Sequence, residues 1–280
     1  MSTKEADAHF AGWMRNNLDL AARHFDLNIT TEPVFGWRLR SIGARAENVH
    51  GPCWLRVVSQ EPEWAQGHSW TGTLAGNKIK GVPKPYVLGV FEWTDGRVQR
   101  AEVSTLMPGQ PCSPTDVLRL PPALSDQWWS DLVRSVDTLA TIRTDRINSD
   151  QNRVTQGIRE RFDGSIDTTV DQWETVHGDL HWSNLVHPTF GLLDWELWGR
   201  GPAGTDAATL LCYSLLVPDT AEAVHALFAD VLDTPTGRIA QLYVVTRLLR
   251  RIDAGDHPDL AEPLTRHAHA VLTTARDDAT

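Results

Sequence analysis

The chain has 280 residues, of which 41% are apolar and 22% are charged, and its formal net charge is −10. This composition is ordinary for a soluble globular protein, and the length allows one large domain or two lobes. The acidic balance offers no basic surface for nucleic acid, so we expect no nucleic-acid partner. The three cysteines are odd in number and far apart, which predicts neither a disulfide framework nor a clustered metal site.

The beginning of the chain also bears on its location in the cell. The first residues lack the apolar core of a signal peptide, and no apolar run is long enough to span a bilayer. We therefore expect a cytoplasmic protein with no membrane partner.

The N-terminal third alternates between helical and strand patterns. Residues 5–26 place apolar side chains near helical spacing, which predicts an amphipathic helix. Strands follow within residues 34–59, separated by a glycine-containing turn over 41–51. Residues 61–80 allow one short helix interrupted by glycines. Apolar and β-branched runs around an Asp-Gly turn predict a β-hairpin over residues 86–106.

A breaker-rich segment, residues 107–114, contains three prolines and one glycine and predicts a linker. It divides a strand-rich part, residues 1–107, from a helical part, residues 108–280. Ser125 is the expected N-cap of the first helix in the second part. Helical periodicity extends over residues 125–143, 150–162, 206–216, 220–232, 237–253 and 258–275.

The chemistry is concentrated between residues 177 and 196. The sequence His-Gly-Asp-Leu-His-Trp-Ser-Asn ends at Asn184, and Gly-Leu-Leu-Asp-Trp-Glu follows after a hairpin-sized spacer. Asp179 is expected to orient an acceptor hydroxyl toward the γ-phosphorus of a nucleotide. Asn184 and Asp194 offer the oxygen ligands that Mg²⁺ accepts beside phosphate and water. This inventory predicts phosphoryl transfer from ATP.

These motifs resemble the signature of the aminoglycoside phosphotransferase and choline kinase family, over roughly residues 34–215. The resemblance implies an α+β, two-lobed protein-kinase-like fold, with a small antiparallel-sheet nucleotide lobe and a larger helical lobe that forms the acceptor pocket. It implies Mg²⁺ with ATP or GTP as donor, and a small hydroxylated acceptor such as an antibiotic, amino alcohol or sugar. By the same resemblance, Asp206 braces the catalytic loop and Met107 lies at the nucleotide-binding hinge. The expected context is antibiotic resistance or biosynthesis.

The nucleotide lobe departs from the family pattern. Arg56 occupies the strand position of the usual phosphate-binding lysine, and arginine is not a geometric equivalent of lysine. Its partner would be a glutamate on the following helix, but Glu61 and Glu63 fall early and no acid occurs over 64–85. Residues 42–48 contain a single glycine and would form a poor phosphate-cradling loop. Two lysines, Lys78 and Lys80, are alternative phosphate contacts.

For four further residues near the motif, a purely structural role is an alternative to a functional one. His177 and His181 are expected to be structural hydrogen-bonding groups that support the site. Asp206 is also explained by plain N-capping of its helix. Glu196 is a candidate contact to the acceptor, and a structural ion pair explains it equally well.

Three other functions stay open at the level of sequence. The acceptor could be a Ser or Thr of a natural-product precursor peptide. The weak lysine, glutamate and glycine-loop signals are typical of a nucleotide-binding pseudokinase. A dimetal phosphoesterase shares the Gly-Asp-Leu-His fragment, and Asp7 and His9 imitate its first metal pair, but no Gly-Asn-His segment occurs.

Overall fold

The computed structural model describes residues 3–162 and 166–277 of the chain. It consists of two compact units. The first comprises the chain up to Lys78 together with Lys84–Met107, and the second comprises Ile79–Pro83 and the chain from Pro108 onward. In the described part of the chain, no helix is both long enough and apolar enough to cross a membrane.

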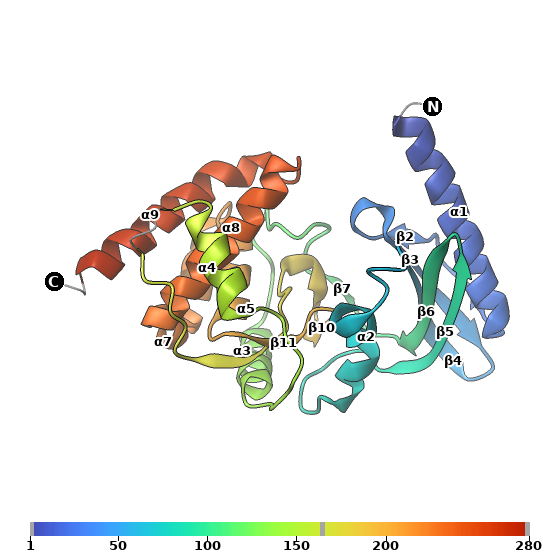
Figure 1. The fold of residues 1–280 in the computed structure, drawn as a ribbon. Helices are drawn as coiled ribbons and strands as arrows, with labels where there is room; N and C mark the ends of the chain where they lie inside the picture. The colour runs from blue at the N-terminus through green and yellow to red at the C-terminus, as the bar shows by residue number, and fades with distance from the viewer. Residues whose placement is uncertain (1–2, 163–165, 278–280) are drawn as a thin grey trace. The chain divides into compact units, whose positions relative to one another are not determined.

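In the first unit, helix α1 packs on an antiparallel sheet (Figure 1). The sheet has the strand order β1-β3-β4-β6-β5, and β2 pairs with β3. Its elements are α1 (Thr3–His24), β1 (Asn28–Ile29), β2 (Val34–Phe35), η1 (Trp37–Leu39), β3 (Ser41–Asn48), β4 (Gly51–Gln60), α2 (Gly67–Ala75), η2 (Gly76–Lys78), β5 (Val87–Asp95) and β6 (Arg97–Thr105). The helix predicted over 5–26 and the hairpin predicted over 86–106 are confirmed.

The core of the first unit lies between α1 and one face of this sheet. Because side chains alternate along a strand, β3, β4 and β6 present one set of apolar residues to the helix and the alternate residues to the other face. The buried set is Met14, Leu18, Ala21, Ala22, Leu27, Ile42, Ala44, Ala46, Cys53, Leu55, Val57, Ala101 and Val103. The opposite face is therefore the one that carries Arg56.

The turn predicted over residues 41–51 is wrong, because Ser41–Asn48 forms strand β3 and pairs along its whole length with β4. The inward side chains are Ile42, Ala44 and Ala46, and two alanines give too weak an alternation to indicate a strand. Gly43 is required by packing, since a Cβ there would lie 2.8 Å from the Trp54 ring.

The second unit is mainly helical. Its helices are α3 (Asp126–Ala140), α4 (Gln151–Arg159), α5 (Thr205–Ser214), α6 (Pro218–Leu227), α7 (Ala229–Leu232), α8 (Pro235–Asp253), η4 (Pro258–Leu260) and α9 (Ala261–Asp277). Ser125 is the predicted N-cap, because its side chain accepts a hydrogen bond from the Trp128 backbone nitrogen at 3.2 Å. The single helix expected over 220–232 is instead two, α6 and α7, separated at Phe228.

Short strands connect these helices and carry the motif residues. They are β7 (Gln110–Pro111), β8 (Trp173–Val176), β9 (Leu185–His187), β10 (Gly191–Leu192) and β11 (Gly199–Pro202), with the 3-10 turn η3 (Trp182–Asn184) before β9. One small sheet has the order β10-β9-β7, and β11 pairs with β8. The loop after β8 and the loop after β10 are the two loops that the sequence motif predicts.

Candidate functional site

The loop after β8 is fixed by a buried carboxylate on α5. Asp206 accepts hydrogen bonds from the backbone nitrogens of His177 at 2.6 Å and Gly178 at 2.8 Å. Burial raises the pKa of Asp206 to about 7, against the effect of these two N–H groups, which favour the ionised form. Gly178 has a φ of +82°, and a Cβ there would lie 2.0 Å from the Asn148 amide, so the loop requires glycine.

Asp179 follows this braced turn, and 28% of its side chain is exposed. The Nε2 atom of His181 lies 3.4 Å from its Oδ2, and Arg247 donates to the Gly178 carbonyl at 3.3 Å. Burial alone would raise the pKa of Asp179, but the charge and hydrogen bond of His181 and the charge of Arg247 hold it well below its usual range. Asp179 is therefore an ionised carboxylate that solvent can reach. It is suited to accept a hydrogen bond and is a weak base.

Asn184 is the last residue of the turn η3, and contacts with the motif loop orient its side chain. The amide nitrogen donates to the backbone carbonyl of Asp179 at 3.0 Å and lies 3.2 Å from His181 Nε2. Because the oxygen and nitrogen of an amide diverge, this contact directs Oδ1 away from the loop backbone. In this orientation the amide oxygen could serve as a metal ligand.

The β9–β10 hairpin brings Asp194 to the same loop. Leu192 pairs with Leu185, and the Leu193 nitrogen donates to the Asn184 carbonyl at 2.8 Å. Asp194, the next residue, therefore lies close to Asn184. Asp194 has a φ of +56°, a left-handed conformation that is uncommon outside glycine and is most tolerated by Asn and Asp. Such a conformation at a motif residue is typical of a functional loop.

His177 joins the two loops. Its Nε2 donates to the Leu193 carbonyl at 2.9 Å, and its ring meets Trp195 edge to face, with 4.9 Å between centroids. Burial lowers the pKa of His177 to about 4, so the ring is neutral near pH 7. A neutral, fully enclosed ring whose N–H is already donated can orient the loops and has no proton to transfer.

The donor set decides what kind of metal site fits here. In the described ranges, no group of three His, Cys, Asp or Glu side chains could hold a metal ion by itself. Asn184 and Asp194 supply one amide oxygen and one carboxylate, too few for a resident structural metal. Mg²⁺ needs few protein ligands when phosphate oxygens and water complete its shell, so the residues fit a cation that arrives with a nucleotide.

Glu196 lies two residues beyond Asp194 and is half-buried. Its backbone carbonyl accepts from the Arg146 guanidinium at 3.5 Å, and that guanidinium lies over the Trp198 ring, 4.7 Å from the centroid. The backbone at Glu196 is thus part of the supporting structure, and an acceptor contact by its side chain stays a prediction.

In the first unit, Arg56 lies on β4 opposite Gly43 of β3 and Glu102 of β6. Glu61 forms an ion pair with Arg97. The helix α2 carries no acidic residue. The acid nearest to Arg56 by register is therefore Glu102, on a neighbouring strand where sequence spacing alone could not place it.

Two other polar residues share the sheet face of Arg56. The Arg100 guanidinium binds Glu102 at 2.8 Å and Glu92 at 2.5 Å. Arg100 and Glu102 are both buried. Met107 is the last residue of the first unit and is half-buried, and no contact recorded in the structure assigns it a task.

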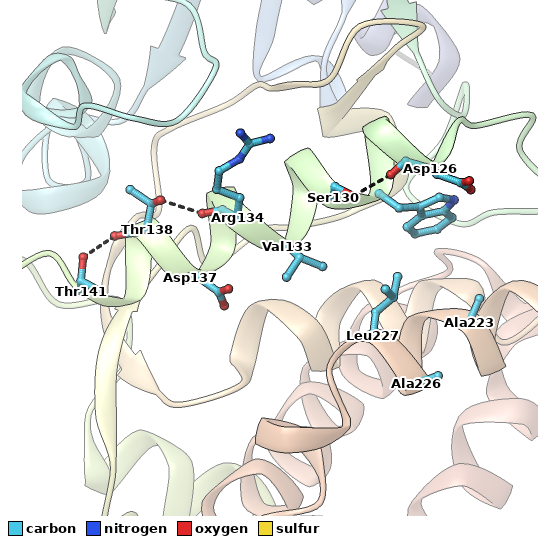
Figure 2. A pocket seen from close by; sticks show the side chains of 11 residues that line it. Asp126, Ser130, Val133, Arg134, Asp137, Thr138, Thr141, Ala223, Ala226 and Leu227 are labelled. Atoms are coloured by element: carbon cyan, nitrogen blue, oxygen red, sulfur yellow. Dashed lines mark hydrogen bonds between the residues drawn. The ribbon is translucent and has the colours of Figure 1, made fainter.

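A large cavity of the second unit lies elsewhere. It measures about 1100 Å³ and lies between α3 and α6, lined by apolar residues such as Val133 and Leu227 and by polar residues such as Arg134 and Asp137 (Figure 2). None of the residues predicted for the site lines it. The predicted site residues therefore lie outside this cavity, on the two motif loops.

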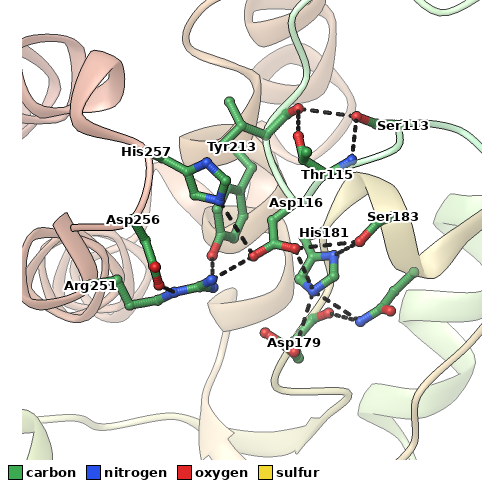
Figure 3. A network of polar contacts seen from close by, with 12 residues as sticks. Ser113, Thr115, Asp116, Asp179, His181, Ser183, Tyr213, Arg251, Asp256 and His257 are labelled. Atoms are coloured by element: carbon green, nitrogen blue, oxygen red, sulfur yellow. Dashed lines mark hydrogen bonds and ion pairs between the residues drawn. The ribbon is translucent and has the colours of Figure 1, made fainter. Parts of the chain in front are cut away.

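Sequence reasoning missed three charged residues of the site. Arg247 reaches the catalytic loop from α8, and Asp116 and Arg251 form an ion pair at 2.8 Å beside it (Figure 3). Asp116 lies next to the breaker-rich linker, where an aspartate indicates only a turn. The two arginines lie on a long helix whose periodicity does not reveal which side chains meet the motif.

Known structures resemble the chain along most of its length, although the sequence matches no protein-family profile and no curated protein. A thermostable mutant of the aminoglycoside phosphotransferase APH(4)-Ia, in a ternary complex with ADP and hygromycin B, matches with a TM-score of 0.60 at 13% identity, over 92% of this chain and 98% of that one. The amicoumacin kinase hAmiN, in complex with AMP-PNP, Ca²⁺ and Ami, matches with a TM-score of 0.58 at 14% identity, over 96% of each chain.

The chain has the protein-kinase-like fold of the aminoglycoside phosphotransferases. The fold predicted from the sequence, α+β with an antiparallel sheet followed by a helical part, is thereby confirmed. Within the aminoglycoside phosphotransferase fold of this chain, the predicted catalytic, metal-binding and supporting residues belong to the second unit, and Arg56 and Met107 belong to the first.

Proposed function

We propose that the chain is a phosphotransferase that moves the γ-phosphoryl group of ATP or GTP to a hydroxyl of a small molecule. The observation that carries this proposal is the pair of loops after β8 and β10, in which Asp206 braces Asp179 and the hairpin sets Asp194 beside Asn184. Phosphoryl transfer depends mainly on positioning and charge stabilisation, and this arrangement provides both.

Asp179 is the proposed catalytic residue. Its ionised, partly exposed carboxylate accepts a hydrogen bond from the acceptor hydroxyl and directs that oxygen at the phosphorus. A low pKa suits this task, since in a loose transition state the hydroxyl proton leaves late and alignment matters more than basicity. Asn184 and Asp194 would hold Mg²⁺, which when bound neutralises charge on the phosphate oxygens.

The nucleotide contacts belong to the first unit in this proposal. Arg56 would bind phosphate oxygens as a fork of two N–H groups, with Glu102 as its neighbour on β6 in place of a helix glutamate. Met107 would contact the base. ADP and AMP-PNP in the similar structures support a nucleoside triphosphate donor.

For the acceptor we propose a small hydroxylated compound of the antibiotic class. The support is that the similar proteins are in complex with hygromycin B and with Ami. An amino alcohol, a sugar or a Ser or Thr of a precursor peptide would use the same loop chemistry, so these acceptors belong in the same test.

The test is transfer of radiolabel from [γ-³²P]ATP and [γ-³²P]GTP, with Mg²⁺, to a panel of hydroxylated compounds that includes aminoglycosides, amino alcohols, sugars and Ser- or Thr-containing peptides. Labelled product from wild type and none from Asp179→Asn supports the proposal. Nucleotide binding without any transfer would instead support a pseudokinase, a function that the acid-free helix α2 also favours.

A further inference from the structure

A polar network surrounds the catalytic loop and is built by three segments that are far apart in the sequence (Figure 3). Asp116 comes from the irregular segment before α3. His181 and Ser183 belong to the motif loop, and Arg251 lies in the last turn of α8. None of these contacts is explained by the roles proposed above for Asp179, Asn184 and Asp194.

His181 lies between two carboxylates. Its Nε2 is 3.4 Å from Asp179 Oδ2 and 3.7 Å from Asp116 Oδ1. A second connection runs through Ser183, whose hydroxyl lies 3.1 Å from His181 Nδ1 and donates to Asp116 Oδ1 at 3.4 Å. Both ring nitrogens of His181 therefore face Asp116, Nε2 at ion-pair distance and Nδ1 through the Ser183 hydroxyl.

Asp116 is itself held from the opposite side. Its Oδ2 binds the Arg251 guanidinium at 2.8 Å. Arg251 is fixed in turn, because it donates to the Tyr213 hydroxyl at 2.7 Å and to Asp256 at 3.1 Å. With three contacts on one guanidinium, Asp116 has a rigid anchor, and its charge is compensated without His181.

We propose that Asp116 is a positioning residue for phosphoryl transfer: anchored by Arg251, its carboxylate holds the His181 ring against Asp179 and so fixes the direction of the Asp179 carboxylate. This inference rests on the proposed function for its kinetic consequence. Displacing a catalytic group by about 1 Å can slow a reaction on the order of 100-fold, so the hold on His181 matters for the rate.

The Asp116→Asn variant isolates the carboxylate. The backbone carbonyl of Asp116 accepts from the Trp182 nitrogen at 3.3 Å, and this contact keeps the segment on the loop when the charge is removed. A matched control exists in Asp259→Asn, which breaks the pairing of an aspartate with Arg119 at 3.0 Å on the same segment and leaves the contacts of Asp116 with Arg251, His181 and Ser183 in place.

The first measurement needs no substrate. Amide hydrogen exchange across residues 177–184 of the full chain should be at least about 10-fold faster in Asp116→Asn than in wild type, and unchanged in Asp259→Asn. Equal protection in wild type and Asp116→Asn would overturn the proposal, whatever reaction the protein catalyses.

The second measurement uses Mg-ATP and a hydroxylated compound that wild type phosphorylates. We expect kcat to fall about 10- to 100-fold in Asp116→Asn, with the KM of both substrates unchanged. In a His181→Gln background the same change should have no further effect on kcat, because Asp116 acts through His181. A raised acceptor KM with normal kcat would make Asp116 a substrate contact and overturn the proposal. Failure of wild type to phosphorylate any compound would refute the proposed function alone, and the exchange experiment would still decide the role of Asp116.

Discussion

One oxygen of the Asp206 carboxylate lies 2.6 Å from the backbone nitrogen of His177, and the other accepts a hydrogen bond from the backbone nitrogen of Gly178. One side chain thereby satisfies two buried backbone donors, one with each carboxylate oxygen. This contact connects the start of α5 to the loop that carries Asp179, and it makes Asp206 the first residue to test.

Asp206→Asn should destabilise the protein by about 1–3 kcal/mol, because the amide nitrogen would face a backbone N–H and leave that donor unsatisfied. Chemical unfolding measures the loss. Turnover should fall as well, since the loop before Asp179 would shift. Asp259→Asn serves as the exposed control, and equal stabilities of the two variants would contradict the bracing role.

Asp179→Asn should reduce turnover by about 10²- to 10⁴-fold and leave nucleotide affinity within a few-fold of wild type. The reason is that Asp179 is assigned to the acceptor hydroxyl and the nucleotide is held elsewhere. Steady-state kinetics and calorimetric titration with Mg-AMP-PNP measure the two effects. A parallel loss of turnover and nucleotide binding would show that Asp179 has a different task.

Asp194→Asn separates backbone geometry from charge, since Asn tolerates the left-handed conformation observed at this position. We expect unchanged thermal stability and roughly 10-fold weaker nucleotide binding in the presence of Mg²⁺, because a neutral amide is a poorer ligand. Binding without Mg²⁺ should stay the same. If the Mg²⁺-dependent gain in affinity survives, Asp194 is not a metal ligand.

Arg56→Ala should weaken nucleotide binding by about 10-fold through loss of charge-assisted contacts to phosphate. Arg56→Lys should recover part of that affinity, because lysine keeps the positive charge but cannot bind two phosphate oxygens at once as a guanidinium does. Arg97→Ala is a suitable control, since Arg97 pairs with Glu61 at the start of β6. Wild-type affinity in Arg56→Ala would place the phosphate contact on another residue.

Acid should destabilise the protein through His267 on α9. Burial, with His225 nearby, lowers the pKa of His267 to about 4 in the folded chain, against about 6.5 when unfolded. The unfolded state therefore binds the proton first, and stability is complete above pH 6.5 and falls as the pH drops toward 4, by up to about 3 kcal/mol. Urea unfolding at pH 7 and pH 4.5 measures this loss. It should be smaller in His267→Leu and unchanged in a variant of the exposed His269, and equal losses in both would assign acid sensitivity to other groups.

Local patterns in the sequence were enough to predict the helices, the β5–β6 hairpin and the two motif loops. From their spacing along one loop and one hairpin, Asp179, Asn184 and Asp194 were predicted to form one site. The structure places these residues side by side. These contacts join residues that are close in sequence, so the local turn-forming residues are enough to predict them.

The partners from remote segments could not be predicted in this way. Glu102 meets Arg56 only through strand register, and Asp116 meets His181 only through the path of an irregular segment across the motif loop. Strand β3 was missed for a different reason, namely that alanine at inward positions buries little apolar area and gives a weak alternation.

The close approach of Gly43 to the Trp54 ring has a consequence for how this protein can diverge. A larger residue at position 43 needs room that only a smaller residue at position 54 would release. The two positions are thus expected to change together during evolution. Arg56 lies opposite Gly43 in the β3–β4 pair, so each such exchange would change the surroundings of Arg56.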